Sequence, residues 1–226
     1  MKTKNVNGYL HEEYHPDRYE EAEMIQRSKD HYQWIDRRRT VREISDRPVP
    51  KEVIENIIMS ASTAPSGAHK QPWTFCVVSN DVIKGKIRAA AEEEERESYA
   101  NRMSDRWLDD LKPIGTDDVK PFIEKAPYLI VVFKRVFERD EEGKKHNNYY
   151  VNESVGIASG FLISAIHNAG LVTLTHTPSP MNFLQNILDR PDNERPFLLL
   201  PVGYAEEEVY VPRLTRKSLD EAAVFY

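Results

Sequence analysis

The stretch from Ala64 to Trp73 reads APSGAHKQPW and decides how the surrounding chain folds. Its two prolines and one glycine predict a loop. Apolar residues recur at helical spacing over 51–62 before it, and a β-branched and aromatic run over 73–79 follows it, so the loop joins a helix to a strand. A loop this rich in proline, glycine and small residues exposes backbone N–H groups that a planar or anionic ligand can approach closely.

Helices and apolar strands alternate along the rest of the chain. We expect further helices over about 81–104, 150–169 and 182–189, and strands over 128–134, 171–177 and 197–204. Gly170 follows the longest helix at the position where a left-handed residue ends helices, and 103–125 reads as an irregular polar segment. The alternation predicts an α/β or α+β sandwich, with residues 31–226 as a single domain and 1–30 as a polar arm that has helical character near 18–29.

Composition excludes several classes of function. The chain has 226 residues and a net charge of −6, which argues against nucleic-acid binding as its main role. Cys76 is the one cysteine, so no intramolecular disulfide can form and a reducing compartment is expected. Residues 1–30 carry no apolar run typical of a signal peptide or anchor, and no His, Cys or Asp cluster has metal-ligand spacing. We therefore expect a cytoplasmic protein with no bound metal and no membrane partner.

A run of arginines over 37–42 (RRRTVR) is the second unusual feature. Arginine triplets are usually solvated surface charge, but guanidinium groups also hold phosphate oxygens in a bidentate fork. The run leads towards the helix at 51–62, and Arg216 offers a further cation in the tail. Together with the small-residue loop, the run predicts a bound cofactor that carries a phosphate.

Three further segments accompany the loop and the arginine run, namely Thr175-His176-Thr177, the LPVGY segment over 200–204 and Arg216-Lys217. Together these five segments resemble the flavin-dependent nitroreductase superfamily, and most closely its iodotyrosine deiodinase branch. The resemblance runs from about residue 34 to the C-terminus. The resemblance implies an α+β nitroreductase-like fold with a central, mostly antiparallel sheet flanked by helices. It also implies an intertwined homodimer that exchanges its C-terminal tails and binds two FMN molecules at the interface.

The resemblance assigns roles to individual residues of the flavin site. The FMN phosphate, ribityl chain and ring would be held by Arg38, Arg39, Thr40, Arg42, Pro65, Ser66, Thr175, His176, Thr177 and Arg216. Two groups would act in catalysis, the Thr177 hydroxyl near flavin N5 and the Ala68 backbone N–H facing the substrate phenolate. His176 stands where the resemblance leads us to expect a third threonine. Two interpretations are open for it, a ring that tunes the flavin and a packed neighbour.

A lid over about 92–125 distinguishes the deiodinase branch from other reductases. Glu95 and Tyr99 are four residues apart on a predicted helix and so share a face, and Lys120 lies in the irregular segment that follows. By resemblance, Glu95 binds the ammonium group of an amino-acid substrate, Lys120 binds its carboxylate, and Tyr99 adds a hydrogen bond. The alternative is open as well, because consecutive glutamates such as those over 92–95 are typical of the solvated face of a helix.

The activity implied is the reductive dehalogenation of halotyrosines, in which 3-iodotyrosine becomes tyrosine and iodide by two successive one-electron transfers through FMN. Removing an aryl halide needs electrons that no side chain supplies, so a redox cofactor is required. NAD(P)H or a separate reductase would deliver the electrons, and halophenols are further candidate substrates. Two alternatives are open, a generic nitroreductase or quinone reductase that uses hydride transfer, and a flavin-binding or halotyrosine-binding protein without turnover.

Overall fold

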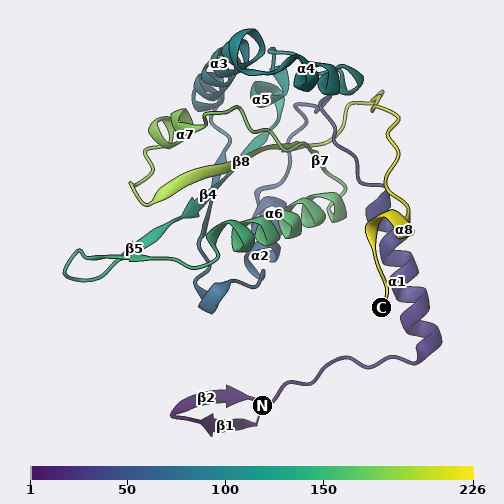
Figure 1. The fold of residues 1–226 in the computed structure, drawn as a ribbon, viewed down its shortest axis with the longest axis vertical. Coiled ribbons are helices and arrows are strands. Elements are labelled where there is room, and N and C mark those ends of the chain that lie inside the picture. Colours follow the sequence, from purple (N-terminus) through teal and green to yellow (C-terminus); the bar gives the residue numbers. More distant parts are fainter. Residues whose placement is uncertain (1) are drawn as a thin grey trace. The chain divides into compact units, whose positions relative to one another are not determined.

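A computed structural model describes residues 2–226 as two compact units, one up to Arg38 and one from Arg39 onward (Figure 1). Each unit has its own secondary structure, and the larger unit carries the sheet on which the expected site depends. No helix within residues 2–226 combines the length and the apolar character that crossing a membrane requires.

The N-terminal unit contains a hairpin and a helix. Strands β1 (Thr3–Val6) and β2 (Tyr9–Glu12) pair antiparallel, and helix α1 (Glu21–Asp36) follows with none of its residues buried. Asn7 and Gly8 connect the strands with φ angles of 54° and 89°, which suits the two-residue Asn-Gly turn. The sequence analysis anticipated the helix and missed the hairpin, although the Asn-Gly pair was a signal for it.

The larger unit is built on a four-stranded sheet in the order β3-β4-β8-β7. These strands are β3 (Trp73–Val78), β4 (Tyr128–Arg135), β8 (Glu194–Gly203) and β7 (Val172–Thr173), and every neighbouring pair is antiparallel. The expected α+β fold with a central antiparallel sheet is therefore confirmed.

Helices cover both faces of this sheet (Figure 1). Helices α2 (Lys51–Ser62) and α6 (Val151–Asn168) lie on one face, and α3 (Asp81–Glu97), α5 (Pro121–Lys125) and α7 (Asn182–Ile187) lie on the other. Strand β4 serves both layers because its side chains alternate. Ile130 and Val132 pack towards α2 and α6, whereas Leu129, Val131 and Phe133 pack towards the other helices. All five are fully buried, so this strand is a continuous apolar run in the sequence.

The segment 103–125, which we expected to be irregular, is largely helical. Helix α3 runs into the π-helical turn η2 (Ser98–Arg102), and then α4 (Asp105–Leu111), the 3-10 turn η3 (Lys112–Ile114) and α5 follow. The Ser104 hydroxyl caps α4 by accepting a hydrogen bond from the Trp107 amide at 3.3 Å, and Pro121 opens α5. The expectation was wrong because helices of one or two turns leave almost no periodicity to detect.

The strand expected over 171–177 is shorter than predicted. Only Val172–Thr173 forms a strand, and the chain rejoins β8 at His176, which bridges to Leu199. Gly170, with φ of +74°, confirms the left-handed residue expected after α6. The remaining elements are the 3-10 turn η1 (Gly67–His69), the strands β5 (Phe137–Arg139) and β6 (Lys145–Asn147), which pair as a hairpin, and α8 (Leu219–Ala222) in the tail.

Candidate active site

A cavity of about 200 Å³ lies on the face of the sheet that α3 and α5 cover. Its wall combines Arg42, the lid residues Glu95, Tyr99 and Lys120, and the segment Thr175–Thr177. The structure thus brings residues assigned to the flavin and residues assigned to the lid to one place. The expected site residues of the larger unit that do not line this cavity are Arg39, Thr40, Pro65, Ser66, Ala68 and Arg216. Arg38 belongs to the N-terminal unit.

The Thr175–Thr177 segment presents its side chains alternately. The His176 amide donates to the Leu199 carbonyl at 2.9 Å, and the Leu199 amide donates back at 3.0 Å, so the backbone is held against β8. Thr175 and Thr177 are exposed, whereas His176 is buried. In extended chain, alternate residues face opposite sides. The two threonines are therefore open to a ligand, and the histidine points into the protein.

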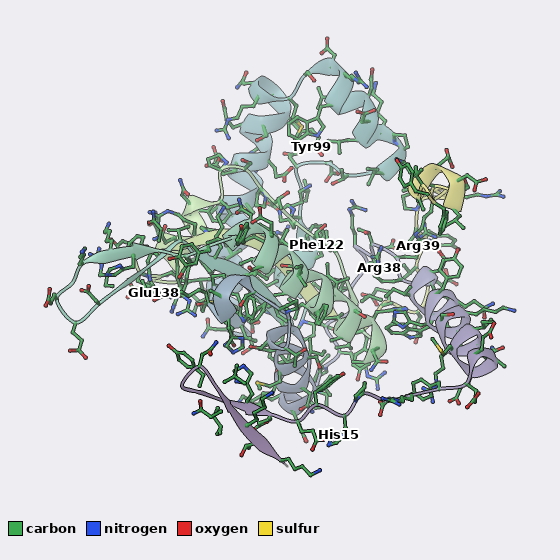
Figure 2. All side chains as sticks on the ribbon, turned by 60° about the horizontal axis from the view of Figure 1, so that its bottom comes forward. His15, Arg38, Arg39, Tyr99, Phe122 and Glu138 are labelled. Atoms are coloured by element: carbon green, nitrogen blue, oxygen red, sulfur yellow. The ribbon has the colours of Figure 1, made fainter. Side chains whose placement is uncertain are left out.

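The three residues assigned to the lid meet at the cavity. Lys120 Nζ lies 3.5 Å from Glu95 Oε2 and donates to the Thr116 hydroxyl at 3.1 Å and to the Asp117 carbonyl. The side chains of Lys120 and Glu95 are only 3% and 12% exposed. Tyr99 donates from its hydroxyl to the Thr116 carbonyl at 3.2 Å. It lies among the helices that cover this face, and Phe122 lies closer to the sheet (Figure 2).

Glu95 and Lys120 form a pair of an acid and a base with little exposure to water. Burial raises the pKa of Glu95, and the nearby Lys120 ammonium opposes that rise without cancelling it. Burial likewise raises the pKa of Tyr99, so its phenol is a neutral hydrogen-bonding group. A site with one largely desolvated charge of each sign is complementary to a zwitterion.

The π-helical turn η2 is hydrogen-bonded to the loop that follows Thr177. Ser98 Oγ donates to the Ser179 carbonyl at 3.3 Å, and Arg102 Nη1 donates to the same carbonyl at 3.0 Å and to Glu94 at 2.8 Å. A π-helical turn inside a helix is frequent at functional sites, because the extra residue re-aims the side chains beyond it. Tyr99 lies within this turn and lines the cavity.

Arg42 is the strongest candidate to hold an anion. It is half-buried, and burial lowers its pKa. Within residues 2–226 no carboxylate or other hydrogen-bond acceptor contacts its guanidinium. A half-buried cation without an acidic partner is costly unless a ligand supplies the negative charge. The donor set at this end of the cavity therefore fits a phosphate-bearing cofactor such as FMN.

Other cofactor candidates are positioned by the backbone around Arg42. Thr40 forms a parallel bridge with Thr173, and the Val41 amide donates to the Thr173 carbonyl at 3.2 Å. Arg39 donates to the Pro212 carbonyl in the C-terminal tail. Arg39 and the C-terminal tail therefore lie together, and Arg216 follows in the exposed part of the tail.

The loop between α2 and β3 has an unusual backbone. Ala68, His69 and Gln71 have φ angles of 48°, 54° and 45°, a left-handed conformation that L-residues other than glycine adopt at a cost. Ser66 supports the loop by accepting from the Gln71 amide at 2.9 Å. The Ala68 amide is exposed and has no hydrogen-bond partner within residues 2–226. Such a donor on a strained loop is suited to binding an anionic oxygen.

Gly67 explains how closely this loop approaches the start of α6. Its amide donates to the Ser154 hydroxyl at 3.3 Å, and an added Cβ would lie 3.0 Å from Tyr150 Cδ2 and 3.1 Å from the Tyr149 carbonyl oxygen. Any larger residue would push the loop away from the helix. The glycine is thus required by close packing.

Sequence reasoning missed Thr116, which contacts two of the residues assigned to the lid. Its hydroxyl accepts from Lys120 and its carbonyl accepts from Tyr99, so one residue holds both. Thr116 and Lys120 are four residues apart, but they lie between helices, where that spacing predicts no shared face. No sequence signal identified Thr116.

A second cavity, of about 680 Å³, contains none of the expected site residues. Its buried Lys84 donates to the carbonyls of Glu124 and Ala126, both at 3.0 Å, and pairs with Asp81 at 2.9 Å. All three ammonium donors are thereby satisfied, which indicates a structural lysine. Within residues 2–226, no group of three or more His, Cys, Asp and Glu side chains could hold a metal ion.

Comparisons with known proteins agree with this geometry. The sequence profile of the nitroreductase family matches residues 35–204. An iodotyrosine deiodinase of Haliscomenobacter hydrossis is 66% identical over 206 residues, which cover 91% of this chain and 92% of that protein. Iodotyrosine deiodinase 1 of Homo sapiens is 48% identical, over 91% of this chain and 72% of that protein.

A solved structure of oxidised iodotyrosine deiodinase, bound to FMN and 3-iodo-L-tyrosine, matches with a TM-score of 0.73 and 30% identity. The match covers 86% of this chain and 97% of that one. A nitroreductase with bound FMN from Bacteroides fragilis shares the fold, with a TM-score of 0.61 at 18% identity over 83% of this chain and 94% of that one. The chain belongs to the nitroreductase family and, within it, to the iodotyrosine deiodinases. The resemblance inferred from the sequence is confirmed.

Proposed function

We propose that this protein is an FMN-dependent reductive dehalogenase that converts 3-iodotyrosine to tyrosine and iodide. The observation that carries the proposal is the buried Glu95–Lys120 pair, which lies in one cavity with Arg42 and Thr177 in a chain so similar to deiodinases. Replacing iodine by hydrogen on the phenol ring consumes two electrons and one proton and releases iodide. When bound, FMN supplies the electrons in single-electron steps.

The lid residues bind and orient the amino-acid end of the substrate. Glu95 accepts the ammonium group, Lys120 donates to the carboxylate, and Tyr99 adds a hydrogen bond. Each charge-assisted hydrogen bond in a desolvated site contributes about 1.5–3 kcal/mol. Closing the lid of residues 92–125 over the substrate excludes water and fixes the aromatic ring for reduction.

The loop around Ala68 would hold the phenol end of the substrate, and the residues on either side of the site would hold the cofactor. The Ala68 amide donates to the substrate phenolate, and fixed donors of this kind stabilise an anionic oxygen without the reorganisation that water requires. Thr177 would offer its hydroxyl to the flavin ring at N5, with Thr175 next to it, and the side chain of His176 between them points into the protein. Arg38, Arg39, Thr40, Arg42 and Arg216 bind the phosphate and ribityl chain, and Pro65 and Ser66 line the ring.

A second copy of the chain completes the enzyme in this proposal. On α6, Ile157 and Phe161 are each 43% exposed, and a Cβ added at Gly156 or Gly160 would meet no atom within 4 Å. This bare face of glycines and large apolar side chains supports a homodimer packed through α6, with the tails exchanged. Phe161→Glu should then give a monomer in light scattering and lower the FMN content, whereas a variant that stays dimeric would rule out this interface.

Electrons come from NAD(P)H or from a separate reductase, and a cytoplasmic location fits the single Cys76. The function is tested under anaerobic conditions with dithionite-reduced holoenzyme and 3-iodotyrosine, by following tyrosine and iodide formed per FMN. We expect repeated turnovers with equal amounts of the two products. A yellow protein that reduces nitroaromatics with NAD(P)H and releases no iodide would instead be a generic nitroreductase, and one that binds iodotyrosine without turnover would be a binding protein.

A further inference from the structure

His176 is buried, whereas its neighbours Thr175 and Thr177 are exposed. Its side chain is 7% exposed, and its ring meets Phe122 edge-on, with centroids 5.7 Å apart and an interplanar angle of 86°. Nε2 is buried and has no hydrogen-bond partner within residues 2–226. Nδ1, in contrast, lies 3.9 Å from Glu95 Oε1. The ring is thus directed at the lid carboxylate.

The Glu95 carboxylate is shared between two neighbours. Its Oε2 atom lies 3.5 Å from Lys120 Nζ, and its Oε1 atom lies 3.9 Å from His176 Nδ1. Both separations lie beyond the usual range of about 2.7–3.2 Å for such a hydrogen bond, so the carboxylate keeps acceptor capacity for a further donor. Contacts of groups in an active site often shorten when a substrate binds.

Burial and the nearby cations keep the His176 ring neutral. The groups that face it are Glu95 on α3, Tyr99 in η2, Lys120 before α5, and Arg42. Burial, together with Lys120 and Arg42, lowers the pKa of His176 to about 3. A neutral imidazole carries one N–H, and a proton on Nδ1 faces a carboxylate whereas a proton on Nε2 would have no acceptor. The favoured tautomer therefore carries its proton on Nδ1.

We propose that His176 is a positioning residue of the lid, whose neutral ring donates from Nδ1 to Glu95 and holds that carboxylate ready for the ammonium group of the substrate. The proposal rests on the function proposed above and adds a determinant of substrate preference. Without this donor, Glu95 turns fully to Lys120 and the two charges satisfy each other. His176 thereby favours zwitterionic halotyrosines over plain halophenols, which have no ammonium group to bind.

The test compares 3-iodotyrosine with 2-iodophenol, the same iodinated phenol without the amino-acid part. His176→Leu removes both ring nitrogens. His176→Asn keeps an amide N–H near the position of Nδ1, and His176→Gln places its amide near Nε2 instead. His146→Asn is the matched control, because His146 is an exposed histidine that pairs with Asp140 on the β5–β6 hairpin. The activity of each FMN-loaded variant is measured as kcat and KM for both substrates.

We expect His176→Leu and His176→Gln to raise KM for 3-iodotyrosine about ten-fold, the typical worth of one hydrogen bond to a charged group, with kcat nearly unchanged. In both variants the loss of kcat/KM is several-fold smaller for 2-iodophenol than for 3-iodotyrosine, and His176→Asn recovers most of the loss on 3-iodotyrosine. The acid limb of kcat/KM for 3-iodotyrosine also moves to higher pH in His176→Leu, because Glu95 loses a donor that favours its ionised form.

The proposal would be overturned if the ratio of kcat/KM for 3-iodotyrosine to kcat/KM for 2-iodophenol were the same in the Leu and Gln variants as in the wild type. Equal losses on both substrates would also overturn it, because they would indicate a role at the flavin or in folding. Should the Leu variant fail to fold, the polar Gln variant alone decides the matter. If the wild type dehalogenates neither substrate, it is the proposed function that fails, and that outcome is visible before any variant is made.

Discussion

Glu95 and Glu194 are both glutamates of the larger unit with little exposed side chain, at 12% and 4%, but their surroundings differ. The Glu194 side chain is 4% exposed and accepts from Arg190 Nε at 2.7 Å and from the Thr74 hydroxyl at 2.6 Å. Burial would raise its pKa, but these two hydrogen bonds outweigh burial and lower the pKa. Glu95 has its nearest cation at 3.5 Å, and burial raises its pKa.

The difference separates a structural carboxylate from one that is prepared for a ligand. Glu194 is saturated by short hydrogen bonds between β3, β8 and Arg190, so binding anything else would break a stable network. Glu95 is desolvated but incompletely paired, a state that costs stability unless a ligand completes it. The same residue type therefore serves the sheet in one place and the site in another.

The largest effect we expect comes from Glu95→Gln. Removing one charge-assisted hydrogen bond of about 1.5–3 kcal/mol lowers kcat/KM for 3-iodotyrosine roughly 10- to 150-fold. Activity on 2-iodophenol stays within about two-fold, and the free energy of unfolding changes by less than about 1 kcal/mol, because a desolvated carboxylate is replaced by a neutral amide. Steady-state kinetics on both substrates check this, and equal losses on the two would remove Glu95 from the substrate site.

Glu194→Gln should give the opposite result. Its loss leaves Arg190 without an anionic partner, so we expect the free energy of unfolding to fall by about 1–3 kcal/mol. The ratio of kcat/KM for the two iodinated substrates should not change. Urea unfolding and the same kinetic assay measure the two quantities. A changed ratio with unchanged stability would mean that the comparison assigns the two glutamates wrongly.

His176 adds a dependence of stability on pH. Its pKa is about 3 in the folded protein and 6.5 ordinarily, so between these values the unfolded chain binds a proton that the folded chain does not. The free energy of unfolding therefore falls as the pH falls from 6.5, by up to about 1.4 kcal/mol per pH unit from this group. We measure the free energy of unfolding of the wild type and of His176→Asn in urea between pH 6 and 4.5. The slopes of this free energy against pH should differ by the contribution of His176. Parallel slopes would mean that the histidine is protonated in the folded state.

The smallest effect is expected at an exposed pair. His146 Nε2 lies 2.7 Å from Asp140 Oδ2, and both side chains are open to solvent, at 54% and 38% exposure. Solvent screens such a pair, so its short distance carries little stability. His146→Asn should leave both the melting temperature and the substrate ratio unchanged within error. A clear change in either would show that distance, and not burial, decides which pairs matter.

The sequence predicted the fold better than it predicted the lid. The helix over 51–62, the loop at Ala64 and the strand from Trp73 were all correctly predicted, because long periodic segments carry strong signals. The helices within 103–125 were missed because they are too short to show a period. The spacing of Glu95 and Tyr99 predicted a shared face, and the structure brings both to the cavity.

Two features of the site were beyond sequence reasoning. Lys120 meets Glu95 across a segment without periodicity, so only the resemblance to a known family indicated that both belong to one site. His176 was expected beside the flavin or packed in the core, and the contact with Glu95 depends on how α3 crosses the strand segment. The roles of the individual site residues stay predictions.

The measurement that tests the central claim most directly is a titration of Glu95 and Glu194 by carbon-detected NMR of labelled glutamate, with and without 3-iodotyrosine. Single Gln variants assign the two resonances. We predict that Glu95 titrates above the ordinary value of 4.5 and moves down when the ammonium group binds, whereas Glu194 titrates below 4.5 and ignores the substrate. Two glutamates that titrate alike, and a Glu95 that does not respond to 3-iodotyrosine, would contradict the account.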